Sequence, residues 1–301
     1  MRRPSQLPPE LGSAFSTEDG LKAGVSRQRS RAVDLATPFR GIRTALPIET
    51  TSDRARAYST RMPDAQFFSH LTAAELLGLR LPERFRPGLL EVTSIAPLRA
   101  SRGAGIVGHQ ASSGETIIVD GLRVSSPLMT WLDLGAFLPL DDLIVMGDGL
   151  LSRLAPRCTP SQVESALRDH ARRRGHARLT EAWASIRPRT DSARESMLRL
   201  LVVRAGFPEP EVNPEIRNQF DAVIAHGDLT YPEYKVILEY DGGGHRTDER
   251  QFHIDIDRLD ALMEEGWRVI RVNKSLMARH ATLCGKIDTA LRDRGWIPSS
   301  S

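Results

Sequence analysis

The stretch at residues 227–245, GDLTYPEYKVILEYDGGGH, combines a short apolar run with four carboxylates, a glycine triplet and a histidine. The Val-Ile-Leu run at 236–238 predicts a buried strand. An unpaired carboxylate in a low-dielectric interior is costly, yet Asp228, Glu239 and Asp241 crowd this one hairpin. Their mutual repulsion requires a compensating cation, so the stretch indicates a functional site rather than a plain core strand.

Strand alternation predicts how these side chains are directed. Glu239 and Asp241 are two residues apart and therefore face the same side of the strand, whereas Tyr240 faces the other side. Glycines at 242–244 let the backbone turn sharply and bring His245 back towards the carboxylates, where its imidazole can transfer a proton. We therefore expect the three carboxylates to point into one pocket, with the imidazole at its rim.

Helices and strands alternate around this hairpin. The sequence predicts, in order, a helix at 192–206, strands at 212–216, 220–226 and 235–241, a helix from 247 to 265, a strand at 267–272 and a helix at 275–294. Gly206 and Gly266 follow the first two helices, as expected of residues that end helices. The predicted order is therefore α-β-β-β-α-β-α.

This order, with the acidic residues placed in it, resembles the PD-(D/E)XK nuclease fold. The nearer likeness is to the very-short-patch repair endonuclease branch and its relatives, which share the pattern D…vEyDG…H…D..R…L…GW.V.R. The matching residues are Asp228, Glu239, Tyr240, Asp241, Gly242, His245, Asp255, Arg258, Leu262, Gly266, Trp267, Val269 and Arg271. The resemblance covers residues 190–295 and implies a restriction-endonuclease-like α-β-β-β-α-β core.

The resemblance also implies a chemistry. It makes Asp228 and Glu239 ligands of Mg²⁺ (or Mn²⁺), an ion that prefers oxygen ligands and lowers the pKa of a bound water. Glu195 and Asp241 would be auxiliary acids, and His245 would be a proton shuttle. Cleavage of DNA by an activated water is the activity that follows.

Local alternatives stay open for several of these residues. Glu195 lies three residues after Ser192, so its carboxylate can complete a capping box at the start of the helix. Arg258 can contact DNA, or it can pair with Asp255, three residues earlier on the same helix face. Asp228 can be an ordinary turn residue.

One position departs from the nuclease signature. The signature expects Lys two residues after the strand Glu, and this chain has Asp241 there. The string EYK at 233–235 also reads E-x-K, but it lies at a turn. Without that Lys, charge on the scissile phosphate has to be met by the metal, by His245, or by Arg258 and Arg271. Loss of activity is therefore a serious alternative.

Length and composition bound the class of protein. The chain has 301 residues and is 40% hydrophobic, which allows two or three domains and a sizeable core. Cys158 and Cys284 lie far apart without metal-ligand spacing, which indicates neither a disulfide framework nor a zinc site and fits a reducing cytoplasm. No apolar run is long enough to cross a bilayer. We expect a soluble, cytoplasmic protein without a membrane partner.

The first 62 residues carry 11 Lys/Arg against 6 Asp/Glu and predict a DNA-binding part. Residues 15–35 predict two helices in helix-turn-helix spacing, and residues 36–47 could supply a wing. The second helix would direct three cations outward, Arg27, Arg29 and Arg31. The alternative is a plain helical hairpin with a solvated basic face.

The middle of the chain is interpreted as α+β. A helix at 69–82 precedes predicted strands at 89–95, 105–109, 116–120 and 122–126 and two further helices. No clustered nucleophile, base and orienting group is found there, so His70 and His109 are interpreted as isolated structural or surface residues. A later helix runs into three consecutive arginines, which are either a solvated face or a contact with the DNA backbone: Arg172, Arg173 and Arg174.

The whole chain also resembles, more weakly, proteins that join an abortive-infection antitoxin-like (AbiEi-like) winged helix and middle region to a nuclease-like tail. SHLTAAELLGL at 69–79, VTS at 92–94 and GLRVSSPLMTWLDL at 121–134 carry this likeness. Together the patterns predict an α/β multidomain protein with a winged-helix-like DNA-binding region at 1–62, an α+β middle domain at 63–190 and a nuclease-like domain at 191–301.

Two classes of function follow. The first is Mg²⁺-dependent hydrolysis of DNA phosphodiester bonds, in DNA repair or in defence against foreign DNA. The alternative is a non-catalytic, DNA-binding transcriptional regulator of antitoxin type whose nuclease domain is degenerate. A third hypothesis is that the acidic cluster binds metal to hold the fold together. DNA is the expected partner in the first two, and the sequence does not decide on a toxin or a second copy of the chain.

Overall fold

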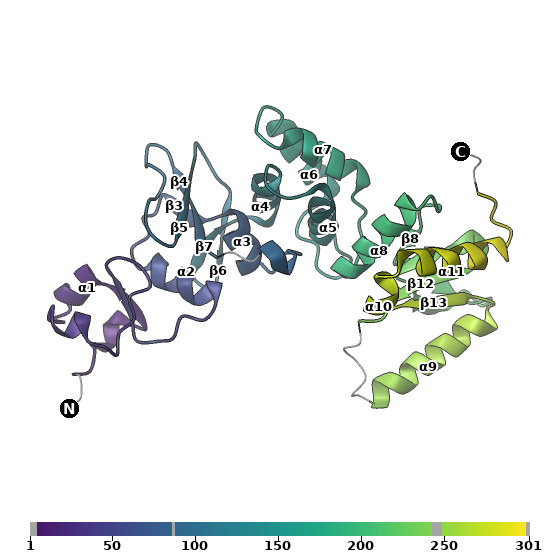
Figure 1. The fold of residues 1–301 in the computed structure, drawn as a ribbon, viewed down its shortest axis with the longest axis horizontal. Coiled ribbons are helices and arrows are strands. Elements are labelled where there is room, and N and C mark those ends of the chain that lie inside the picture. The colour runs from purple at the N-terminus through teal and green to yellow at the C-terminus, as the bar shows by residue number, and fades with distance from the viewer. Residues whose placement is uncertain (1–4, 86–87, 243–248, 299–301) are drawn as a thin grey trace. The chain divides into compact units, whose positions relative to one another are not determined.

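The computed structural model describes residues 5–85, 88–242 and 249–298 and shows a mixed α/β protein with several separate sheets (Figure 1). The chain divides into two compact units, 1–138 with 163–179 and 139–162 with 180–301. An α/β protein of more than one domain is thus confirmed, and the three-part division of the sequence stays a prediction. In the described ranges, no helix is long and apolar enough to cross a membrane.

The N-terminal segment of the first unit is small. A single 3-10 turn, η1 (Pro9–Leu11), precedes β1 (Ala14–Ser16), which pairs antiparallel with β2 (Ile42–Thr44). The intervening α1 (Thr17–Lys22) begins after Ser16, whose hydroxyl accepts a hydrogen bond from the Asp19 amide at 3.0 Å. A small apolar cluster holds this segment together, formed by Leu11, Phe15, Val25 and Leu35.

The second helix predicted in this segment is wrong. A single 3-10 turn, η2 (Arg29–Arg31), forms there, and the backbone is already extended at Ala32. The Arg29 guanidinium bonds both carboxylate oxygens of Asp34 at 2.8 Å and the Ser5 carbonyl at 2.7 Å. These contacts close a loop over the residues that a second helix would need, so the predicted helix-turn-helix is one helix followed by a loop.

A five-stranded sheet in the order β5-β4-β3-β7-β6 forms the centre of the first unit. Its strands are β3 (Gln66–Phe68), β4 (Leu90–Ile95), β5 (Ile106–Ala111), β6 (Thr116–Val119) and β7 (Leu122–Ser125). The β4–β5 and β3–β7 pairs are parallel, and the other two pairs are antiparallel. The adjoining helices are α2 (Thr51–Ser59), α3 (His70–Leu76) and α4 (Pro127–Leu134), with the short 3-10 turn η3 (Glu83–Phe85) after α3.

Helices α5 (Leu140–Leu150), α6 (Pro160–Asp169) and α7 (His176–Ser185) follow. Because α6 ends at Asp169, the arginines at 172–174 lie in the turn between α6 and α7 and not in a helix as predicted. All three arginines are exposed. Their exposure agrees with both interpretations of the run, a solvated face or a contact with DNA.

The second unit contains a four-stranded sheet in the order β13-β12-β11-β8 and a separate antiparallel pair, β9 with β10. The strands are β8 (Glu211–Val212), β9 (Glu215–Arg217), β10 (Val223–His226), β11 (Leu229–Tyr231), β12 (Val236–Tyr240) and β13 (Arg268–Val272). The helices are α8 (Ala193–Arg204), α9 (Glu249–Glu264), α10 (Lys274–Met277) and α11 (His280–Arg292), and the 3-10 turn η4 (Pro232–Tyr234) joins β11 to β12.

The elements of this unit keep the predicted alternation of helices and strands, but the strand predicted at 212–216 is divided into β8 and β9, and β11 is an additional strand. The sequence predicted no strand between residues 226 and 235, but residues 229–231 form β11, which pairs antiparallel with both β8 and β12. Pro232 comes directly after this strand, where its missing N–H removes no hydrogen bond of the ladder. The added strand is what sets Asp228 beside Glu239.

Apolar clusters cover both faces of the four-stranded sheet. Leu238 of β12 packs in one cluster with Leu198 of α8, and its neighbour Ile237 packs in the other with Leu262 of α9. Adjacent strand residues point to opposite faces, so α8 and α9 lie on opposite sides of the sheet. Glu239 shares the face of Ile237 and is directed towards α9.

Candidate active site in the second unit

Asp228 and Glu239 stand opposite each other across the β11–β12 hairpin. The register pairs Leu229 with Leu238, and continuing it by one residue places Asp228 across from Glu239 on the same face. Asp228 Oδ2 also accepts a hydrogen bond from the Tyr240 amide at 2.8 Å. The expectation that these two carboxylates share a face of the sheet is therefore confirmed.

Arg258 on α9 compensates the charge of Glu239. Its Nη1 and Nη2 donate to the two carboxylate oxygens at 2.5 and 3.0 Å, and Glu239 is 7% exposed. Such a bidentate pair between planar groups is strong and directional. The guanidinium is thus held against Glu239, and a contact between Arg258 and DNA stays a prediction that requires this pair to open.

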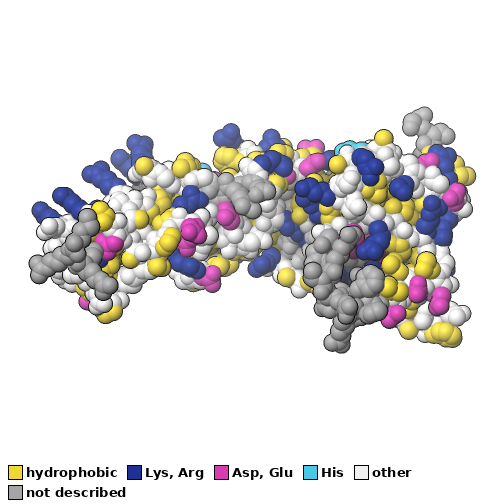
Figure 2. All heavy atoms as spheres, turned by 60° about the horizontal axis from the view of Figure 1, so that its bottom comes forward, with side chains coloured by type: hydrophobic (Ala, Val, Ile, Leu, Met, Phe, Trp, Pro, Cys, Tyr) yellow, Lys and Arg dark blue, Asp and Glu magenta, His cyan; other side chains and the backbone are white. Residues whose placement is uncertain are grey.

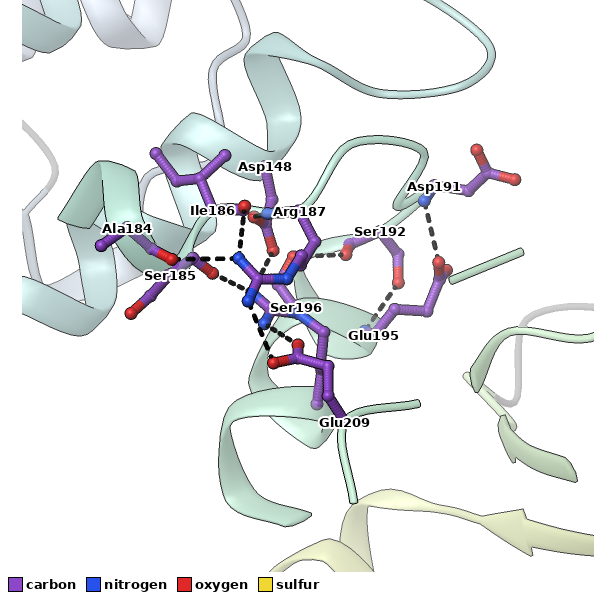
Figure 3. Close-up of polar contacts among 11 residues, drawn as sticks. Asp148, Ala184, Ser185, Ile186, Arg187, Asp191, Ser192, Glu195, Ser196 and Glu209 are labelled. Carbon is purple, nitrogen blue, oxygen red and sulfur yellow. Dashed lines mark hydrogen bonds and ion pairs between the residues drawn. The ribbon is translucent and has the colours of Figure 1, made fainter. Parts of the chain in front are cut away.

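Glu195 lies at the edge of the same site. Its carboxylate is buried and accepts hydrogen bonds from the Asp191 amide and from Asn213 Nδ2, both at 2.8 Å. Ser192 caps α8 by accepting from the Glu195 amide, but the Glu195 side chain bonds the Asp191 amide and not that of Ser192 (Figure 3). Glu195 therefore supports the helix start and also lies near enough to Asp228 to raise its pKa.

The electrostatics of Asp228 reflect this crowding. Burial, together with the nearby Glu195 and Glu239, raises its pKa to about 7, while the Tyr240 amide and Arg258 act in the opposite direction. A carboxyl with a pKa near neutrality can both hold and release a proton at physiological pH. The acidic pair is thus coupled to one cation, Arg258, and to one auxiliary acid, Glu195.

Asp241 has a different ionic partner. Its carboxylate pairs with Arg271 at 3.3 Å, and it lines an open hollow of 480 Å³ with Arg194, Gly242, Asn273, Lys274 and Ser275. The expectation of one pocket for all three hairpin carboxylates stays a prediction for Asp241. His245, the expected proton shuttle, lies outside the described residues.

The donor chemistry of the acidic pair fits Mg²⁺ or Mn²⁺. Mg²⁺ is commonly held by one or two carboxylates and keeps several waters, and Asp228 and Glu239 offer two carboxylates on one face. In the described part of the chain, the group of His, Asp and Glu ligand atoms that lie close enough together to hold a metal ion is in the first unit. Among these described residues, no third ligand atom therefore joins Asp228 and Glu239. Arg258 has to leave Glu239 before the ion can bind there, because its guanidinium pairs with both carboxylate oxygens.

The N-terminal cations are only partly available to a ligand. Arg27 and Arg31 are exposed, but the Arg29 side chain is 11% exposed and pairs with Asp34. Figure 2 shows Lys and Arg side chains standing out from the surface in many places. Arg29 therefore stabilises its own loop, and the expectation that it projects outward is wrong.

The structure also brings together two histidines that the sequence analysis treated as isolated. His70 and His109 stack on each other with ring centroids 3.7 Å apart, and Glu91 lies against both. The sequence offered one usable signal: Glu91 and Thr93 alternate on a predicted strand that precedes the predicted strand of His109 in the chain. The contact depends on the pairing of these two strands, which the sequence did not predict.

Comparison with known proteins gives distant likenesses. No family model matches the chain. The uncharacterized proteins MT2308 and Rv2248 of Mycobacterium tuberculosis (strains CDC 1551 / Oshkosh and ATCC 25618 / H37Rv) are each 24% identical over 168 residues, which is 56% of this chain and 61% of theirs. The chain therefore spans about three fifths of the length of the curated relatives it matches.

One solved structure is also similar. The crystal structure of the RV2827C protein from Mycobacterium tuberculosis matches with a TM-score of 0.42 and 16% identity, over 69% of this chain and 84% of that one.

A pH dependence of stability follows from the raised pKa of Asp228. Between pH 4 and pH 7 the folded protein keeps a proton that the unfolded chain has released, so stability is greatest below this window and falls as the pH rises through it. Asp228→Asn keeps the acceptor for the Tyr240 amide and removes the titration. We expect wild type to lose about 2 kcal/mol relative to Asp228→Asn between pH 5 and pH 7, in urea denaturation with EDTA present.

Asp260→Asn is the matched control, because Asp260 is an exposed carboxylate on α9. Its stability difference from wild type should stay constant over the same pH range. Parallel pH profiles for wild type and Asp228→Asn would show that Asp228 is ionised in the folded protein at pH 5.

Proposed function

We propose that the chain is a metal-dependent DNA endonuclease, acting in the cytoplasm by hydrolysing phosphodiester bonds, with its centre in the second unit. The observation that carries the proposal is the placement of a buried carboxylate, Glu239, opposite a partly buried one, Asp228, on one sheet face, with Glu195 near Asp228. A purely structural role would favour apolar side chains at such positions. The alternation of α8, a set of strands, α9 and β13 supports the proposal of a restriction-endonuclease-like core, although five strands and not three lie between α8 and α9.

Each residue has a distinct role in this proposal. Asp228 and Glu239 would hold Mg²⁺ or Mn²⁺, which supplies charge on the phosphate and an activated water. Asp228 can move a proton near neutral pH, and Glu195 fixes the start of α8 beside it. Arg258, when it leaves Glu239, can pair with a phosphate oxygen in the bidentate way it now pairs with the carboxylate.

The position of the missing Lys has a neighbouring cation. Asp241 stands there, and Arg271 is paired with it at 3.3 Å with about half of its side chain exposed. Arg271 therefore supplies positive charge near that position, although from β13 and not from β12. We assign Arg271 the role of stabilising negative charge on the phosphate.

A second function is favoured by the same ion pairs. Arg258 and Arg271 neutralise Glu239 and Asp241 without any metal, as expected of a nuclease fold that has lost activity and retains a binding role. The protein would then be a DNA-binding regulator of antitoxin type. The exposed cations for such binding are Arg27, Arg31, Arg172, Arg173 and Arg174.

Nicking of supercoiled plasmid DNA separates the two functions. We expect wild type to nick with Mg²⁺ or Mn²⁺ and not with EDTA. Asp241→Lys should raise the rate by up to about 100-fold, because a positioned cation at the phosphate is worth about that much. Asp260→Lys makes the same change of charge at an exposed site on α9 and controls for a general gain in DNA affinity.

The outcomes differ for each function. An inactive wild type with an active Asp241→Lys variant would show that the nuclease fold has lost its activity, and it would favour the function of a DNA-binding regulator. If both bind DNA and neither nicks it under any metal, the nuclease proposal fails.

A further inference from the structure

Three side chains from three elements of the first unit meet on one face of its sheet. His70 is the first residue of α3, directly after β3; Glu91 lies on β4; and His109 lies on β5. The parallel register pairs His109 with Thr93, two residues after Glu91, so Glu91 and His109 point to the same face. Residues 21 and 18 positions apart in sequence are thereby brought into contact.

The distances among these groups are those of a ligand set. Glu91 Oε2 is 2.9 Å from His109 Nε2 and 4.0 Å from His70 Nδ1, and all three atoms lie within 4.8 Å of one another. Zinc binds His nitrogen and carboxylate oxygen at about 2.0–2.2 Å, which spaces neighbouring ligand atoms about 3–3.5 Å apart. The observed distances bracket this spacing, so small side-chain rotations complete the site.

Neighbouring groups hold the two imidazoles in place. His70 Nδ1 lies 2.9 Å from Ser69 Oγ, which also accepts a hydrogen bond from Thr93 Oγ1 at 2.7 Å. Phe137 packs edge-on against both rings, with centroids 5.4 and 6.5 Å away. Residue 70 also has a positive φ of 50°, a conformation that is uncommon for histidine and that aims its ring at Glu91.

The cluster opens on a pocket of 390 Å³. His70 and His109 form part of its wall, and its other polar side chains include Asp133 on α4 and Arg173 in the turn before α7. An anionic oxygen entering this pocket would meet Arg173 and the histidines together. The pocket thus gives the cluster an open side, as catalytic metal sites have and structural ones lack.

We propose that His70, Glu91 and His109 bind one divalent transition-metal ion of the Zn²⁺ class, in a site whose open position faces this pocket. Two imidazoles and one carboxylate are a ligand set typical of zinc enzymes, whereas Mg²⁺ prefers oxygen ligands throughout. The ion takes the lone pair of His70 Nδ1, and Ser69 keeps its hydrogen bond with Thr93. A water or an anionic ligand oxygen fills the remaining position. The inference is independent of the nuclease proposal, which concerns other residues in the other unit.

Cobalt is the probe, because Co²⁺ replaces Zn²⁺ and its visible absorption reports nitrogen and oxygen ligands. Full-length protein, stripped with a chelator and dialysed, is titrated with Co²⁺ by calorimetry and absorption. We expect one equivalent to bind, Zn²⁺ to displace it, and millimolar Mg²⁺ to leave it bound. Glu91→Gln and His109→Ala should each weaken the affinity for Co²⁺ by about 100-fold or more, since even outer-shell changes cost 10- to 100-fold.

Two controls make the result specific. His280→Ala removes an exposed histidine on α11, and Asp260→Asn removes an exposed carboxylate on α9; both should bind Co²⁺ like wild type. Circular dichroism of the metal-free variants checks the fold, and Glu91→Gln preserves shape if His109→Ala does not fold. The proposal is overturned if wild type binds no Co²⁺, or if Glu91→Gln binds it as tightly as wild type.

Discussion

Replacing Arg199 with leucine is expected to lower the free energy of unfolding by about 3–5 kcal/mol, the largest stability effect of any single substitution considered for this chain. Arg199 lies on α8 and is 1% exposed, and its guanidinium bonds Asp148 at 3.3 Å, Glu209 at 2.8 Å and the Ser185 carbonyl at 2.7 Å. Without it, Asp148 would be a buried carboxylate with no cation. Urea denaturation followed by circular dichroism measures the loss.

Asp148 is the reason for the size of this effect. It is fully buried on α5, and burial raises its pKa while Arg199 opposes that rise. Its other oxygen accepts from the Arg187 amide at 2.7 Å, within the contacts drawn in Figure 3. Breaking one half of a buried pair is costlier than removing both halves. Asp148→Asn combined with Arg199→Leu should therefore recover at least half of the loss.

Arg204→Leu is the matched control on the same helix. Arg204 pairs with Asp141 of α5, as Arg199 pairs with Asp148 of α5, but both side chains of this second pair are about half exposed. An exposed pair contributes about 0–1 kcal/mol, so its loss should be small. Equal losses in Arg199→Leu and Arg204→Leu would contradict the assignment of a buried charge network.

The parts of the fold that the sequence predicted well are those with a strong local pattern. The helix α8 has Ser192 to begin it and Gly206 to end it, and β12 is an apolar run between turn residues. In contrast, β11 has three residues next to a proline, and its strand character depends on β8 and β12 on either side. Local propensity could not supply that pairing.

The second helix predicted in the N-terminal segment is wrong for a related reason. The spacing of Arg27, Arg29 and Arg31 suits a helix, but the contact of Arg29 with Asp34 and with the Ser5 carbonyl favours a loop. A contact between residues 24 apart carries no periodic signal in the sequence. Tertiary contacts therefore overrode local propensity there.

The candidate sites show the same limit. Sequence reasoning found Asp228 and Glu239 because they flank one hairpin, but it looked for a metal as their counter-charge and did not identify Arg258 of α9 as the partner of Glu239. Cysteine spacing was used to argue against a zinc site, and that argument does not bear on two histidines and a glutamate. Their meeting depends on the parallel register of β4 and β5, which no local pattern encodes.

The largest functional effect is expected at the acidic pair. Asp228→Asn and Glu239→Gln should each lower metal-dependent nicking by at least about 100-fold, because a bound metal ion is worth several kcal/mol of transition-state stabilisation. Both substitutions keep the shape of the side chain, and the carboxamide oxygen introduced by Asp228→Asn can still accept from the Tyr240 amide. Affinity for DNA, measured with Ca²⁺ in place of Mg²⁺, should change little, because the exposed arginines are untouched.

The control and the contrary outcome define what this loss means. Asp260→Asn removes one carboxylate from the exposed face of α9 and should nick like wild type. Glu239→Gln removes the ion pair that Arg258 makes with Glu239, so a fall in DNA affinity there, but not in Asp228→Asn, would assign the defect to Arg258 and not to the metal. If wild type nicks DNA and Asp228→Asn nicks it equally fast, the catalytic centre lies elsewhere in the chain, and the acidic pair with Arg258 is a structural element of the second unit.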